Sequence, residues 1–173
     1  RSTINVPGGD GIRILSSGVS PVDLTEITQD NPAYLQYLNI NAKTGIRIEN
    51  QSGMPNACHV TSTLKLNIEA ETGVYVWGDF STEFHYAGDV SSEMHLKTTG
   101  KAIVLGNDNG TGTDAYFEGQ GELKIVSDGD GLSVYDATVH FGGLFKASIQ
   151  SNDGAAINGN RSMSWIRKES PES

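Results

Sequence analysis

The sequence predicts an all-β protein, a single-stranded parallel β-helix of about six coils with a right-handed path. Three observations support this prediction. A short turn motif recurs along the chain, and each copy is followed by an apolar–any–apolar alternation in one phase. The composition agrees, because 21 residues are glycine and only 36% are hydrophobic, as in chains that turn often between short strands.

The recurring turn has the form Asp-Gly or Thr-Gly, as in "DGIRI" at 10–14 and "TGVYV" at 72–76. Its second residue lies at positions 11, 45, 73, 101, 131 and 154, which are 23 to 34 residues apart. Five of these residues are glycine, and Lys101 is the exception. We expect this residue to form a corner between two strands, where a positive φ favours glycine.

Each repeating unit carries two or three short period-2 strands, such as "LKLNI" at 64–68 before a turn and "FHY" at 84–86 after one. One unit cannot bury its own apolar face, but stacked units can, with each strand parallel to its equivalent in the next unit. An antiparallel β-sandwich also has short strands, yet it does not predict one turn signature with one apolar phase. The repeat therefore favours the solenoid.

One domain accounts for the length of 173 residues. We expect residues 1–160 to form the β-helix and residues 161–173 to form a C-terminal cap and polar tail. Residues 23–38 are expected to form a longer loop or short helix in the first coil, because Pro32 interrupts their helical pattern.

The charge and hydropathy of the chain exclude some partners. A net charge of -9 argues against nucleic-acid binding through phosphate contacts. No run approaches the roughly 18 apolar residues of a membrane helix, so membrane insertion is not expected. The single cysteine, Cys58, cannot form an internal disulfide.

The strand phase predicts an apolar outward column. Tyr75, Trp77, Ile103, Leu105 and Tyr135 are all expected to point outward, and Trp77, Leu105 and Tyr135 should span about 10 Å over successive coils. An exposed apolar patch of this kind usually marks a contact with another molecule or with another part of the protein. It is either covered by a loop or another subunit, or it is a platform for the apolar faces of sugars.

The third strands predict a ladder of outward polar side chains. His59, His85 and His140 each lie at the centre of an apolar–His–apolar triplet, and Glu118 takes the place between the last two. Such a ladder is either a solvated row or, where two or three side chains converge, a metal or catalytic site.

The acidic turns are candidate calcium ligands. Asp128 and Asp130 lie in one turn, and Asp153 is expected to occupy the place of Asp130 one coil later. Stacked carboxylates repel each other unless they are solvated or bridged by a cation, and Ca²⁺ prefers such oxygen ligands. A structural Ca²⁺ and simple solvated turn capping both remain open.

No catalytic residues are predicted. The chain has no nucleophile-elbow, zinc-protease or P-loop motif, and its glycines punctuate turns. Arg13 and Arg47 occupy equivalent outward positions in neighbouring coils, where they could bind a carboxylate. These observations argue against an enzyme without excluding one.

The run at 121–159, "GELKIVSDGDGLSVYDATVHFGGLFKASIQSNDGAAING", resembles the bacterial carbohydrate-binding β-helix domains related in fold to pectate lyases. The matching positions are Leu123, Ile125, Ser127, Asp130, Gly131 and Leu132, then Ala147, Ile149, Ser151, Asp153, Gly154 and Ala155. The resemblance implies an extracellular or cell-surface protein that binds polysaccharide and often holds Ca²⁺ between coils. Earlier coils depart from it, with Thr44 and Thr72 in place of Asp and Lys101 in place of Gly.

The expected function is therefore a non-catalytic, extracellular polysaccharide-binding or adhesion module. One alternative is a structural β-helix such as a phage tail spike or fibre, located on the virion, in which the aromatic column joins the subunits of a trimer. A second alternative is a lyase-like enzyme.

Overall fold

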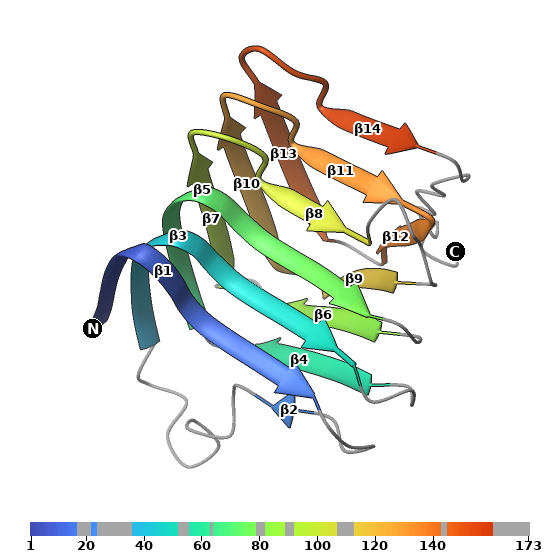
Figure 1. The fold of residues 1–173 in the computed structure, drawn as a ribbon. Coiled ribbons are helices and arrows are strands. Elements are labelled where there is room, and N and C mark those ends of the chain that lie inside the picture. Colours follow the sequence, from blue (N-terminus) through green and yellow to red (C-terminus); the bar gives the residue numbers. More distant parts are fainter. Residues whose placement is uncertain are drawn as a thin grey trace.

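The computed structural model describes residues 1–16, 22–23, 36–51, 56–62, 64–78, 82–88, 92–106, 113–142 and 145–160. Every strand pairing in this part of the chain is parallel. The strands stack in chain order along one axis, so the chain is a β-solenoid (Figure 1). The prediction of an all-β fold of stacked parallel coils is confirmed.

Each full coil has three faces (Figure 1). The first face contains the beginnings of three long strands followed by three short ones: β1 (Ser2–Ser16), β3 (Gln36–Asn50), β5 (Leu64–Gly78), β7 (Glu93–Thr98), β10 (Glu122–Ser127) and β13 (Lys146–Ser151). The second face continues the long strands around the first corner and then adds β8 (Ile103–Leu105), β11 (Leu132–Tyr135) and β14 (Ile157–Asn160). The third face is a separate sheet of β2 (Val22–Asp23), β4 (Asn56–Ser62), β6 (Thr82–Gly88), β9 (Thr113–Gly119) and β12 (Ala137–Phe141).

The core lies between the three faces and is built from rows of equivalent apolar residues. One row on the first face runs through Ile40, Ile68, Leu96 and Ile125, each at most 2% exposed. The third face adds aromatic rings, among which the buried Phe117 stacks on Phe141 with 5.2 Å between ring centroids. Each row gives every coil an apolar neighbour above and below, which a single unit lacks.

The first corner changes in length along the axis, and this change decides which side chains face outward. In β3, three residues separate Ala42, the last position on the first face, from Ile46, the first position on the second face. The equivalent positions in β5, Ala70 and Val74, are also separated by three residues. Four separate Thr98 from Ile103 and Ser127 from Leu132, and five separate Ser151 from Ile157. The turns absorb these extra residues, so the strands on both sides stay in register.

The longer turns after β7 and β10 are held by hydroxyl groups at the ends of these two strands. Thr98 Oγ1 donates to the carbonyl oxygen of Gly100 at 3.2 Å, and Ser127 Oγ donates to that of Gly129 at 2.8 Å. The short turns have Ala42 and Ala70 at the same position, which cannot make this bond.

The structure corrects the predicted role of the corner glycines. Among the described residues, positive φ angles occur at Gly106, Gly119 and Asp136, and none of these lies at the first corner. At Gly45 glycine is instead needed because the next coil approaches closely. A Cβ on Gly45 would lie 2.5 Å from the carbonyl oxygen of Gly73 and would collide with the Ile68 side chain.

Ala102, rather than Lys101, is the corner residue of the fourth copy. Val74 N donates to Ala102 O at 2.8 Å, and Ile103 N donates to the oxygen of Gly131, the corner residue of the next coil, at 3.0 Å. The prediction placed Lys101 there because it did not include the extra turn residue.

Some domain predictions concern residues that the structure does not describe. Of the expected loop or helix at 23–38, residues 24–35 lie outside the described part, while residues 36–38 begin β3. The expected cap and tail at 161–173 also lie outside it.

Substitution at the corner tests the close approach of the coils. Gly45→Ala should lower the free energy of unfolding by about 1–3 kcal/mol, because the added methyl group meets backbone and a buried side chain. Gly8→Ala is the matched control, since a Cβ there meets nothing within 4 Å, and its effect should stay within about 0.5 kcal/mol. Urea unfolding measures both, and equal effects of the two substitutions would contradict this account of the corner.

Candidate ligand-binding face

The outward side of the second face is organised in two rows of equivalent positions. The first row contains Arg13, Arg47, Tyr75, Val104 and Ser133. The second row contains Leu15, Glu49, Trp77, Gly106 and Tyr135. Neighbours in a row are one coil apart, about 4.8 Å.

The structure corrects the predicted aromatic column at two positions. Ile103 and Leu105 are fully buried and pair with the inward Val74 and Val76, so the prediction that they face outward is wrong. Val104, which lies between them in the chain, is the outward residue and is partly exposed. The extra residue in the first-corner turn shifts this strand by one position, which moves every side chain to the opposite face.

Trp77 and Tyr135 remain on one outward row, and both are partly exposed. Gly106 lies between them, with a φ of 73° and its amide bonded to Val76 O at 2.8 Å. A Cβ at this position would run into the carbonyl group of Tyr135. The row therefore has two rings two coils apart, about 10 Å, and the position between them on the row, Gly106, has no side chain.

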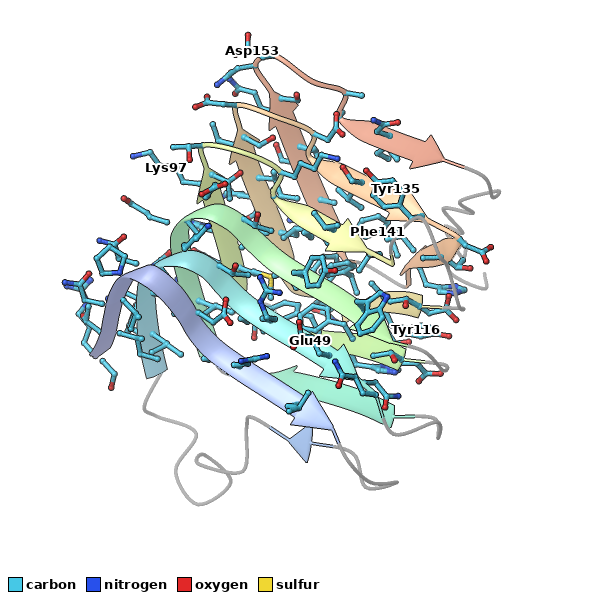
Figure 2. All side chains as sticks on the ribbon, viewed as in Figure 1. Glu49, Lys97, Tyr116, Tyr135, Phe141 and Asp153 are labelled. Atoms are coloured by element: carbon cyan, nitrogen blue, oxygen red, sulfur yellow. The ribbon has the colours of Figure 1, made fainter. Side chains whose placement is uncertain are left out.

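Tyr135, which is labelled in Figure 2, is held in place by Lys101. Lys101 Nζ donates to Tyr135 Oη at 2.8 Å and lies 5.3 Å from the centroid of its ring. Asp130 Oδ2 is 3.7 Å from the same ammonium group. The hydrogen bond with Tyr135 raises the pKa of Lys101, and Asp130 adds to this effect against the opposing effect of burial.

An ion network lies beside the rings on the coils of β1 and β3. Arg13 donates to Glu49 at 2.9 Å, and Arg47 donates to Asp10 at 3.0 Å and to Glu49 at 3.1 Å. The guanidinium of Arg47 also lies 5.0 Å above the ring of Tyr75. The two arginines are neighbours as predicted, and the carboxylates that they bind belong to this chain.

The pKa values of this network favour the charged forms. Burial raises the pKa of Glu49, but hydrogen bonds from Arg13 and Arg47 outweigh burial and hold it below its usual value. Burial alone would lower the pKa of Arg47, yet its bonds to Glu49 and Asp10 raise it. Both ions therefore stay charged at neutral pH.

The cations of this face are more exposed than the carboxylates that pair with them. The side chains of Arg13 and Lys101 are 57% and 40% exposed, against 13% for Glu49 and 12% for Asp130. The second face therefore presents positive groups to solvent although the chain has a net charge of -9.

The predicted calcium ligands are not stacked as expected. Asp153 N donates to Asp128 O at 2.9 Å, whereas Asp130 lies beside Ala155, because the last turn is five residues long. Asp130 accepts hydrogen bonds from Ser133 Oγ at 2.8 Å and from Ala155 N and Asn158 Nδ2, each at 3.0 Å. Burial raises the pKa of Asp130, but these donors and Lys101 lower it overall.

Asp130 is thus a buried acceptor that ties the last two coils together. The carboxylates of Asp128 and Asp153 are exposed, and Asp128 accepts from Asn152 at 2.9 Å. Among the described residues, no group of three or more His, Cys, Asp or Glu side chains is arranged to hold a metal ion. A calcium ion at this turn stays a prediction, with Asp128 and Asp153 as the accessible carboxylates.

The third face corrects the predicted histidine ladder. Tyr116, rather than Glu118, pairs with both His85 and His140. The three rings are stacked, with centroids 4.4 Å apart in each contact. Glu118 pairs with Ala87, one row away. His59 pairs with His85 in the backbone register as expected, but its side chain lies outside the described part.

The ladder is an aromatic stack with carboxylates beside it. Glu83 Oε2 is 2.8 Å from His85 Nε2, and Asp114 Oδ1 accepts from the amide of Thr138 at 3.0 Å. Burial raises the pKa of Tyr116, and the surrounding carboxylates raise it further. Stacking covers both faces of the Tyr116 ring and one face of each histidine ring.

The comparisons give no assignment for the chain. No protein-family model matches the sequence, and no significant similarity to a curated protein or a solved structure was found. Within the described residues, no helix is long and apolar enough to cross a membrane.

The lowered pKa of Asp130 and Glu49 predicts acid destabilisation. Because their folded pKa values lie below the unfolded ones, about 3.9 and 4.3, they stabilise the fold above those values, and this stabilisation is lost as the pH falls through the folded values. Thermal melts at neutral pH and at successively lower values below about pH 5 measure the loss. Asp130→Asn should lower stability at neutral pH and flatten the acid slope, whereas Glu71→Gln, a change at an exposed carboxylate, should leave both unchanged. An unchanged slope in Asp130→Asn would refute this.

The calcium prediction has its own test. If Asp128 and Asp153 share Ca²⁺, EDTA should lower the melting temperature and added Ca²⁺ should restore it, since an ion that binds only the folded state must stabilise it. Asp128→Asn and Asp153→Asn should remove this sensitivity while keeping the Asp130 bonds. Identical melting temperatures in EDTA and in Ca²⁺ count against the site.

Proposed function

We propose that this chain is a non-catalytic polysaccharide-binding module that acts at the extracellular or cell surface and binds its ligand on the second face. The observation that carries the proposal is the pair of partly exposed rings, Trp77 and Tyr135, on one outward row with Gly106 between them. The resemblance of residues 121–159 to carbohydrate-binding β-helix domains points in the same direction.

The spacing of the two rings suits a sugar ring between them. Two coil spacings amount to about 10 Å, so a ring held midway lies about 5 Å from each aromatic residue. Ring contacts are favourable at centroid distances of about 4.5–7 Å. A sugar has apolar faces for such contacts and hydroxyl groups at its edge for the polar groups around the gap.

The gap is largely fixed before a ligand binds. Lys101 holds the hydroxyl group of Tyr135, and the Gly106 backbone is bonded to the neighbouring coil. A fixed site loses less conformational entropy on binding, so more of the contact energy contributes to affinity.

The exposed cations favour an acidic polysaccharide. Arg13 and Lys101 project further into solvent than Glu49 and Asp130, and both can donate to a carboxylate on a sugar. A neutral glycan would use the rings alone and should therefore bind more weakly.

Removal of one ring tests the proposal. Trp77→Ala should weaken polysaccharide binding by about tenfold, roughly 1.4 kcal/mol, and leave the fold intact, because an outward side chain leaves no core cavity. His140→Ala is the control, since it removes an outward ring from the third face. Isothermal titration with acidic and neutral plant, bacterial and host polysaccharides measures the affinities.

The rival structural role makes a different forecast. If Trp77 and Tyr135 join subunits, as in a trimeric phage fibre, sedimentation should show an oligomer that Trp77→Ala dissociates. That result, or the absence of binding to every polysaccharide tested, would overturn the proposed function.

A further inference from the structure

A groove runs along the solenoid axis beside the first corner, away from the outward rows of the second face. It has a volume of about 400 Å³ and is lined in part by Asn41, Glu69, Lys97, Val126 and Asn152. These residues come from successive coils, since Asn41, Glu69, Lys97 and Val126 occupy one row. From the coil of β3 to that of β13 is four coil spacings, about 19 Å.

The longer turns contribute to the lining of the groove and are held in a fixed shape. Asp128 and Asn152 extend beyond β10 and β13, and Asn152 Nδ2 donates to Asp128 Oδ1 at 2.9 Å. Gln150 Nε2 donates to Asn152 Oδ1 at 3.2 Å. Ser151 Oγ bonds the carbonyl oxygen of Gly129 at 2.7 Å, which ties the turns of two coils together. This part of the lining is therefore present before any ligand binds.

The other residues of the groove offer exposed groups of several kinds. Lys97 projects away from the strands, as Figure 2 shows, and its ammonium lies 3.9 Å from the carboxylate of Glu69. These side chains are 74% and 68% exposed, so water screens their attraction and they can turn to a ligand. Val126 is an apolar residue of the same row and is 43% exposed.

We propose that this groove is a second glycan-binding site, which takes an extended chain of sugars lying along the solenoid axis. Hydrogen-bond donors and acceptors recur along the groove. They are the amide of Asn41, the carboxylate of Glu69 and the ammonium of Lys97. Sugar hydroxyl groups can both donate to and accept from such groups, and Val126 offers contact to an apolar sugar face. The ligand class is the one proposed for the second face, but the site uses none of the residues of that face.

An extended peptide fits the groove less well. Peptides that bind β-sheets usually add a strand to a free edge through main-chain hydrogen bonds. Glu69, Lys97 and Val126 lie on inner strands that are paired on both sides, so they offer side chains and no free edge.

The groove and the second face can be followed separately by NMR on the whole chain. The probes are linear neutral and linear uronic oligosaccharides of increasing length. Titration should shift the amide signals of Glu69, Lys97 and Val126, with an affinity that rises with chain length until the groove is filled. The indole signal of Trp77 reports on the second face.

Substitutions separate the two sites. Val126→Asp should weaken the groove response at least about tenfold and leave the Trp77 response and the melting temperature unchanged, because Val126 is exposed. Lys97→Ala should act in the same direction if the Asp variant perturbs the strand. Lys124→Ala is the matched control, since Lys124 lies two residues from Val126 on β10, is 46% exposed and does not line the groove.

Three results would overturn the groove proposal. The first is that no oligosaccharide shifts the signals of the groove residues. The second is that an extended Gly/Ser/Asn peptide shifts these signals while sugars do not. The third is that Trp77→Ala abolishes the response of the groove residues. A groove response that persists in Trp77→Ala supports the second site even if the second face binds nothing.

Discussion

The parallel hydrogen-bond ladder between coils is the constraint on which the rest of the structure depends. Each backbone position is bonded to its equivalent about 4.8 Å above and below, so side chains of equivalent residues form rows along the axis. A row must be entirely inward or entirely outward, because a slip of one residue exchanges the two sides. The inward row of Ile40, Ile68, Leu96 and Ile125 shows how strictly the first face obeys this rule.

The sequence reveals a row wherever apolar and polar residues alternate without ambiguity. Val74 and Val76 alternate with Tyr75 and Trp77, and the structure places the valines inward and the rings outward as predicted. The run "AIVL" at 102–105 has four apolar residues in succession, so alternation allows two phases. The prediction chose the phase by the distance from the turn motif, and the extra turn residue made that choice wrong.

The prediction for the third face was wrong at one position for a similar reason. In "DAYFEG" at 114–119, both Tyr116 and Glu118 are flanked in a way that permits an outward position in the histidine row. The pairing of the buried Phe117 with Tyr86 decides in favour of Tyr116. The stack of three rings depends on side chains from three coils, and no local pattern encodes it.

The candidate face was predictable in part. Its rings, Trp77 and Tyr135, follow from the strand phase, but the gap at Gly106 and the contact with Lys101 do not. Lys101 and Tyr135 are 34 residues apart, and they meet only because the coils stack in one particular register. A signal for the longer turns after β7 and β10 does exist in the sequence, since Thr98 and Ser127 stand where shorter turns have alanine.

Turn length links the two candidate sites. The longer turns after β7 and β10 carry Lys101 beside Tyr135 on one side of the corner, and they contribute Thr99 and Asp128 to the groove on the other. A residue added to a turn adds little to the entropy of closing that turn, whereas one added within a strand would turn a whole row of the core outward. The solenoid can therefore acquire binding groups at its corners while the ladder and the core stay unchanged. This explains why both sites contain residues of the longer turns, whose length the repeat did not predict.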